Sequence, residues 1–153
     1  MRLTTKGRYG VRAVINLAAS YANRPISIKT IAQQEEISPE FLEQIFFKLK
    51  KADIISSIRG PGGGFVLNKK TAEISVKDIL DAVGEDTYPT PCCAPAEDGG
   101  GCARQSRCVM NKTWYGFYTV LNDFLSNLTL KEILEKSGTK YYEAITTGQD
   151  FSI

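Results

Sequence analysis

The amino-acid sequence predicts a mainly α-helical fold with one small β-hairpin. Three observations indicate this fold class. Apolar residues recur at helical spacing in the first 50 positions, a glycine-rich stretch separates two short apolar runs, and an aromatic seam at helical spacing occupies residues 112–128. With 153 residues, 42% of them hydrophobic, the chain is long enough for one domain, or for one small domain with an appendage.

Three short helices are predicted in the first third of the chain. The first covers residues 3–21, and Ser27 is expected to cap a second helix over residues 28–36. Ser38 followed by Pro39 predicts the start of a third helix that continues to residue 53, because serine is a preferred N-cap and proline suits the first helical position. Two short helices joined by a tight turn, the second with a polar outer face, predict a helix-turn-helix.

A glycine-rich hairpin is expected directly after these helices. Residues 54–58 and 65–67 form the predicted strands, and the sequence RGPGGG lies between them. Such a hairpin is often only a hairpin, but behind a helix-turn-helix in a basic part of the chain it predicts a wing. Its glycines allow close approach to a phosphate backbone, and Arg59 at its base can reach a narrow minor groove. Residues 1–70 are therefore expected to be a winged helix-turn-helix domain that binds DNA.

Residues 71–136 are expected to link this domain to a second subunit. Ser75 and Asp78 form a capping box for a fourth helix that ends at Gly84, and a cysteine loop covers residues 84–111. The helix over 112–128 has an apolar seam formed by Trp114, Phe117, Tyr118, Leu121, Phe124, Leu125 and Leu128. This seam either packs on its own domain or pairs with its copy, and its size favours a long dimerisation helix. Residues 137–153 are expected to be a C-terminal tail.

The charges are distributed unevenly along the chain. Residues 1–70 carry 12 Lys/Arg and 5 Asp/Glu, a net charge of +7, whereas residues 71–153 carry 7 and 12, a net charge of −5. A basic front half suggests a surface that binds a polyanion. No apolar run is long enough to cross a membrane and no secretory signal is evident, so a cytoplasmic protein is expected.

The residue types argue against an enzyme. The chain contains no histidine, which excludes histidine-based acid–base chemistry, histidine-containing triads and histidine metal ligands. It also has no nucleophile motif and no phosphate-binding loop at the start of a helix.

All four cysteines lie in the predicted loop: Cys92, Cys93, Cys102 and Cys108. The loop has too few apolar residues to fold alone, so it is expected to be ordered by a disulfide or a metal. Stable disulfides are uncommon in the cytoplasm, and the closely spaced cysteine pairs of structural zinc sites are absent. Widely spaced loop thiolates suit an iron–sulfur cluster, while zinc binding, thiol redox switching and inert cysteines stay open as alternatives.

Three segments carry a family resemblance: MRLTTKGRYGVRA, ISPEFLEQIFFKLKKADIISSIRGPGGGFVL, and the loop end Cys-x5-Cys-x2-Asn-x2-Trp. Together they resemble the IscR-type iron–sulfur cluster regulators over roughly residues 1–136. These belong to a bacterial winged-helix superfamily that also contains NsrR- and CymR-like regulators. The resemblance implies a homodimer that binds a palindromic operator and controls iron–sulfur cluster biogenesis genes. It also implies a [2Fe–2S] cluster held by three cysteines and one histidine, with cluster assembly or donor proteins as further partners.

By position, the resemblance assigns the three thiolates to Cys92, Cys102 and Cys108. This chain has Asn111 where IscR-type proteins have the histidine ligand, and asparagine is a poor iron ligand. The candidates for the fourth ligand are Cys93, Asp98, Asn111 and a donor from the partner subunit. The gap between the first two thiolates is longer than usual in the family, so a [4Fe–4S] cluster, as in the nitric-oxide sensors, is the alternative cofactor.

The DNA-reading residues follow from residue type and position. Gln44 can pair with adenine and Glu43 can accept a hydrogen bond from cytosine. The resemblance implies that Glu43 discriminates between two classes of site, whereas without it Glu43 is an ordinary exposed residue. Candidate phosphate contacts are Arg2, Lys6, Arg8, Lys48, Lys50 and Lys51. The remaining residues of the expected DNA surface are Ser38, Arg59, Gly60, Pro61, Gly62 and Gly63.

The predicted mechanism is a population shift, in which ligation of the cysteine loop orders the link between the fourth helix and the dimerisation helix. Two other functions fit the sequence. One is a repressor of the same fold without a cluster, regulated by thiol oxidation or by a partner protein. The other is an electron-transfer iron–sulfur protein whose basic half binds an acidic partner.

Overall fold

The computed structural model describes residues 3–19, 24–95 and 101–137. The elements in this part of the chain are α1 (Thr5–Ala19), α2 (Ile28–Glu35), α3 (Pro39–Lys51), β1 (Ile55–Ile58), β2 (Gly64–Leu67), α4 (Val76–Val83) and α5 (Asn111–Asn127). Residues 130–137 form a further helix. Short 3-10 turns lie at η2 (Thr71–Glu73), η3 (Pro91–Cys93) and η5 (Gln105–Arg107). The expected mainly α-helical fold with one small hairpin is confirmed.

The predicted side-chain caps are present at the starts of the helices. The side chains of Ser27 and Ser38 each accept a backbone N–H from the first turn of the following helix, at 3.1 and 3.3 Å. Pro39 occupies the first position of α3. Ser75 and Asp78 form the predicted capping box at the start of α4. Because these caps satisfy backbone groups locally, sequence alone was enough to predict them.

Some element boundaries differ from the predicted ones by a few residues. The first helix begins at Thr5 instead of residue 3, because the Thr4 side chain caps it by accepting the Gly7 N–H at 3.3 Å. Its predicted end lies outside the described residues. The third helix ends at Lys51, two residues early, and Asp53 then adopts a left-handed backbone with φ of 59°.

One apolar core holds α1 to α4 together. Its largest fully buried side chains include Phe46, Ile31, Leu42, Ile45, Leu49, Ile79 and Leu130. Leu130 follows α5, so the chain returns to this core at its described end. Two backbone hydrogen bonds make the same connection, from Val76 N–H to Leu128 O and from Leu130 N–H to Ile74 O, each 2.9 Å long.

The hairpin is antiparallel, and its register runs from Ile55 opposite Leu67 to Ile58 opposite Gly64. Strand β2 is attached to the chain before α2, because Ile26 and Phe65 exchange two backbone hydrogen bonds of 3.0 and 2.8 Å. The Phe65 ring also packs edge-on against the Phe46 ring, with centroids 4.8 Å apart. The hairpin therefore projects from the core in a defined direction.

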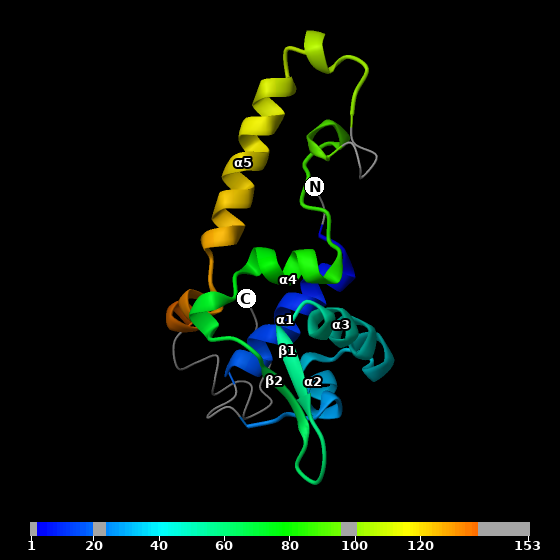
Figure 1. The fold of residues 1–153 in the computed structure, drawn as a ribbon, viewed down its shortest axis with the longest axis vertical. Helices are drawn as coiled ribbons and strands as arrows, with labels where there is room; N and C mark the ends of the chain where they lie inside the picture. Colours follow the sequence, from blue (N-terminus) through cyan, green and yellow to red (C-terminus); the bar gives the residue numbers. More distant parts are fainter. Residues whose placement is uncertain (1–2, 20–23, 96–100, 138–153) are drawn as a thin grey trace.

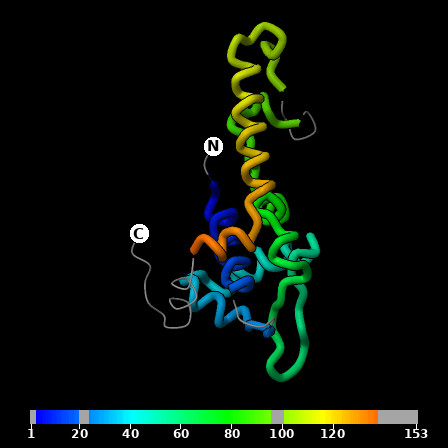
Figure 2. The backbone as a smooth tube through the Cα atoms, turned by 90° about the vertical axis from the view of Figure 1, so that its left-hand side faces the viewer, coloured from blue at the N-terminus to red at the C-terminus, as the bar shows by residue number. Residues whose placement is uncertain are grey.

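The described residues divide into two parts. We call residues 3–83 with residues 129–137 the head, and residues 84–128 the arm. The hairpin projects from one end of the long axis, and the loop before α5 lies at the other end (Figures 1 and 2). Within the arm, the part of the loop that follows α4 lies beside α5. The ring centroids of Tyr88 in the loop and Tyr118 in α5 are 5.1 Å apart. None of the described helices combines the length and the apolar character needed to span a membrane.

Candidate DNA-binding surface and cysteine site

The outward face of α3 carries the residues predicted to read bases. The buried residues of α3 are Leu42, Ile45, Phe46 and Leu49. The exposed residues Glu40, Glu43, Gln44, Phe47 and Lys51 lie on the other side. At 3.6 residues per turn, these five side chains fall within an arc of about 100°. Ser38 lies at the start of this helix as its cap.

The hairpin tip has the geometry expected of a narrow wing. Arg59, Gly60, Pro61 and Gly62 are exposed, and the Gly63 N–H donates to Gly60 O at 2.9 Å to close the turn. Gly60 and Gly62 have φ values of 103° and 77°, which residues with a side chain rarely adopt. The turn thus depends on the glycines and leaves Arg59 accessible to a ligand.

The predicted phosphate contacts occupy different environments. Arg8 and Lys51 are exposed. Lys50 is also exposed, and its Nζ donates to Ser57 Oγ at 2.7 Å, which ties α3 to β1. Arg2 lies outside the described residues.

Lys48 and Lys6 both extend to the C-terminal end of α4. Lys48 Nζ donates to Val83 O at 3.1 Å, and Lys6 Nζ donates to Gly84 O at 3.5 Å. Carbonyl groups at a helix C-terminus carry partial negative charge and attract cations. The nearby Lys6 ammonium lowers the pKa of Lys48, and desolvation adds to this effect. The two lysines therefore connect α1 and α3 to the point where the arm begins.

Glu85 follows Gly84 directly, and its carboxylate is buried. Glu85 is only 5% exposed. One of its oxygens accepts the Thr4 N–H at 2.8 Å, and the other accepts the Thr4 hydroxyl. A Cβ added at Gly7 would lie 2.6 Å from the second oxygen, so the absence of a side chain there permits the contact. Sequence reasoning missed Glu85, because nothing in the local pattern separates it from a solvated loop residue.

The four cysteine thiols are free and differ in exposure. Cys93 is 4% exposed and Cys92 is half-buried, whereas Cys102 and Cys108 are exposed. The Thr90 hydroxyl lies 3.0 Å from Cys92 Sγ and 3.4 Å from Cys93 Sγ. Cys102 Sγ accepts a backbone N–H from two residues further along the chain, at 3.4 Å.

The chemistry of these donors fits an iron–sulfur cluster. Thiolates are the usual ligands of such clusters, and hydrogen bonds to sulfur tune them. Across the described ranges, however, no three Cys, Asp or Glu side chains are gathered into a group that could hold a metal. The structure thus places the thiols on one loop but does not gather three of them into one group. Asp98 lies outside the described residues.

Asn111 lies at the first position of α5, and its N–H donates to Cys108 O at 3.2 Å. Its Nδ2 atom is buried and has no hydrogen-bond partner among the described residues. A buried amide without a partner is uncommon, and an asparagine amide can turn to present its oxygen instead. The side chain is therefore unsatisfied at the point where the cysteine loop meets α5.

α5 has no buried residue anywhere along its length, all of which the structure describes. Phe117, Val120 and Phe124 are 50%, 69% and 62% exposed. Their spacing of three and four residues places them on one side of the helix. Contiguous exposed apolar surface of this kind is typical of an interaction surface.

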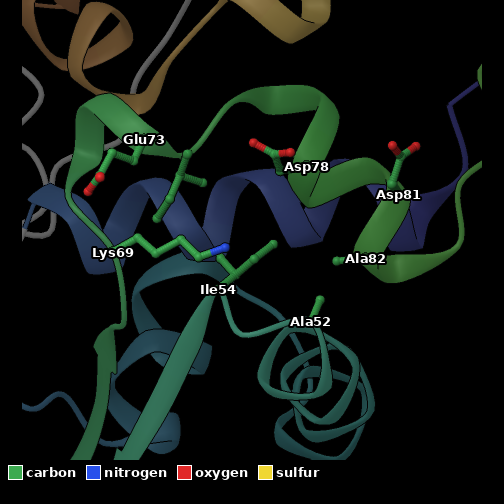
Figure 3. A pocket seen from close by; sticks show the side chains of 8 residues that line it. Ala52, Ile54, Lys69, Glu73, Asp78, Asp81 and Ala82 are labelled. Carbon is green, nitrogen blue, oxygen red and sulfur yellow. The ribbon is translucent and has the colours of Figure 1, made fainter.

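A separate pocket of about 280 Å³ lies between the end of α3 and α4 (Figure 3). Its described lining includes none of the residues predicted to bind DNA or a cluster. Its carboxylates have structural partners: Glu73 accepts a backbone N–H at 3.0 Å, Asp78 caps α4, and Asp81 pairs with Lys77. This pocket is not part of the candidate site.

Comparison with known proteins places the chain in a family. Residues 3–136 match the Rrf2 family, described as iron-dependent transcriptional regulators. The chain is 37% identical over 147 residues to the HTH-type transcriptional regulator IscR of Klebsiella pneumoniae, which covers 92% of this chain and 88% of that protein. It is 36% identical over 147 residues to IscR of Escherichia coli O1:K1, with the same coverage of 92% and 88%.

Solved structures show the same relationship. The structure named T. potens IscR has a TM-score of 0.72 and 28% identity, and covers 92% of this chain and 90% of that one. The structure of CymR, the global cysteine regulator of B. subtilis, matches with a TM-score of 0.70 and 30% identity. The match covers 87% of this chain and 95% of the CymR chain. The predicted resemblance and winged-helix fold are therefore confirmed, and this chain belongs to the Rrf2 family of iron-dependent transcriptional regulators.

Proposed function

We propose that this regulator is a homodimer that binds a palindromic DNA site and senses an iron–sulfur cluster held by its arm. One observation carries the proposal: near the start of the thiol-rich loop, the buried carboxylate of Glu85 binds Thr4 at the start of the head. The resemblance to IscR-type regulators suggests iron–sulfur cluster biogenesis genes as the targets, and the similarity to relatives named IscR agrees with that resemblance.

In this proposal α3 enters the major groove and the wing lies over the neighbouring minor groove. Gln44 and Glu43 contact base edges, and Arg59 enters the minor groove. Ser38 at the start of α3 and residues 60–63 of the wing approach the backbone. The basic residues Arg2, Lys6, Arg8, Lys48, Lys50 and Lys51 contribute sequence-independent affinity through phosphates. In the single chain, Lys6 and Lys48 donate to carbonyl groups at the end of α4.

The dimer forms through α5 in this proposal. The stripe of Phe117, Val120 and Phe124 is exposed in the single chain. Pairing with the same stripe of a second copy buries it, and two-fold symmetry then sets the two wings for a palindromic site. The same contact makes residues 71–136 the connecting and dimerising part of the chain.

The cluster is held by Cys92, Cys102 and Cys108, with a fourth ligand from Cys93, Asp98 or Asn111. The unsatisfied amide of Asn111 supports a role for that residue next to the cluster. When bound, the cluster supplies iron–thiolate bonds that oxidants or iron shortage can break. A [2Fe–2S] cluster is the main form proposed, with [4Fe–4S] as the alternative.

Closure of the loop around these thiolates draws the end of α4 and the start of α5 into one unit. The end of α4 is where Lys48 of α3 and Lys6 of α1 donate. A change in the order of the loop therefore alters contacts of the recognition helix directly. This shifts the population of head orientations in the dimer.

A second candidate function is a repressor of the same fold that carries no cluster. It is favoured by the ungathered thiols of the described residues and by the likeness to CymR. In that case oxidation of the exposed Cys102 and Cys108 thiols, or binding of a partner protein, provides the switch.

Anaerobic purification with absorbance, iron and sulfide measurements tests the cluster. We expect a visible chromophore in the native protein and its loss in Cys102→Ala and Cys108→Ala, because each removes a thiolate ligand. Ser106→Ala, an exposed change in the same loop, is the matched control and should keep the chromophore. Full iron content in both cysteine variants, or a colourless native protein that binds its operator fully, would contradict the cluster switch.

A further inference from the structure

Phe47 is the one exposed large hydrophobic side chain of α3, a helix that the structure describes completely. It is 71% exposed, whereas the adjacent Phe46 is 1% exposed and belongs to the core. At 100° per residue, Phe47 lies between Glu43 and Gln44 around the helix, roughly opposite the buried side. The ring therefore stands at the centre of the face that the proposed function places in the major groove.

The residues Glu40, Glu43, Gln44 and Phe47 follow the spacing i, i+3, i+4 and i+7. Recognition helices that lie in the major groove use this spacing to present one row of side chains to base edges. Phe47 lies about 4.5 Å further along the helix axis than Gln44. This corresponds to one or two base-pair steps.

The chemistry of the groove narrows what Phe47 can contact. A phenyl ring has no hydrogen-bonding group, and the C5-methyl of thymine is the apolar group that bases present in the major groove. We infer that Phe47 is a specificity-determining residue that packs on a thymine methyl, one or two base pairs from the base read by Gln44. The inference rests on the proposed DNA-binding function and adds to it a preferred base.

The test begins with selection of the preferred site from a random duplex library by the intact, anaerobically prepared protein. Each thymine of the selected site is then replaced by uracil, which removes only the methyl group. For the native protein we expect one thymine per half-site to show about a three- to fivefold loss of affinity, the value of one methyl group taken out of water. For Phe47→Ala the thymine and uracil duplexes should bind equally.

Two further variants separate this contact from other effects. Phe47→Leu keeps an apolar side chain and should keep part of the methyl preference, whereas Lys51→Ala, on the same exposed face, should weaken both duplexes by the same factor. Thermal unfolding should be unchanged in Phe47→Ala, because the ring is 71% exposed.

The outcomes distinguish the two proposals. A native protein that selects no sequence contradicts the proposed function itself. If the native protein selects a site but binds the thymine and uracil duplexes equally, only the assignment of Phe47 is overturned. The same holds if Phe47→Ala keeps the native preference for thymine over uracil. Phe47→Ala could also lower the affinity for both duplexes equally while the native protein shows no preference for the methyl group. That result would place the ring against the sugar–phosphate backbone and would also overturn the assignment.

Discussion

The head and the arm are stabilised in opposite ways. In the head, Phe46, Leu42 and Leu130 are each 1% exposed or less. In the arm, α5 has no buried residue, and the described part of the loop before it buries Glu85, Thr87 and Cys93. Burial of apolar surface is the main favourable contribution to folding. The head therefore carries its own stability, whereas the arm has far fewer buried side chains to hold it in place.

This difference suits a sensor. A segment with few buried contacts can change order at a small cost in free energy, whereas a packed core cannot. In the proposed function, the arm can thus respond to a cluster or a second copy while the packed core of the head stays intact. The two parts are joined by hydrogen bonds from Lys6 to Gly84 O, from Thr4 to Glu85 and from Val76 N–H to Leu128 O.

The largest expected effect comes from a cavity in the head. Phe46→Ala should lower the free energy of unfolding by about 3–5 kcal/mol, because it removes a fully buried ring. Urea unfolding followed by circular dichroism measures this loss. Phe124→Ala, measured at a concentration where the chain is monomeric, should cost less than about 1 kcal/mol, since its side chain is 62% exposed. Similar losses in the two variants would remove the contrast between head and arm.

A charge in the apolar stripe of the arm should act on association instead. Phe124→Glu is expected to raise the dissociation constant of the dimer about a hundredfold. A two-fold interface contains the substitution twice, so it loses two buried rings and gains two charges. Thr119→Glu is the matched control, since Thr119 is exposed on the other side of α5. Sedimentation equilibrium measures both, and equal effects of the two changes would argue against the stripe as the dimer contact.

The smallest expected effect concerns the contact between the two parts. Glu85→Ala should lower the free energy of unfolding by about 1–2 kcal/mol, because the Thr4 N–H and hydroxyl lose their acceptor. Glu85→Gln keeps an acceptor for the N–H and should lose less. In the alanine variant, the ratio of DNA affinities with and without the cluster should also move toward one. If the ratio stays unchanged while stability falls, Glu85 supports the fold and does not transmit the state of the loop.

Local features were predicted well and long-range contacts were not. Ser38 with Pro39 located the start of α3, because a cap is formed by residues only a few positions apart. The contact of Lys48 with DNA stays a prediction. Its hydrogen bond to Val83 O, 35 residues away in sequence, is a long-range contact that the sequence did not reveal. Phe47 was overlooked because it follows Phe46 directly, although its spacing from Glu43 and Gln44 already placed it on the outward face.

By itself, the sequence determined the winged helix-turn-helix, the long fifth helix and the loop that holds all four cysteines. These depend on periodicity, caps and turn residues, which act over short distances. Only the tertiary structure decided that α4 ends against Lys6 and Lys48, that Glu85 is buried at Thr4, and that no three of the described cysteine and acidic side chains form a metal-binding group. The physical reason is that these contacts join residues distant in sequence, and their partners are set by how the packed core orients each helix.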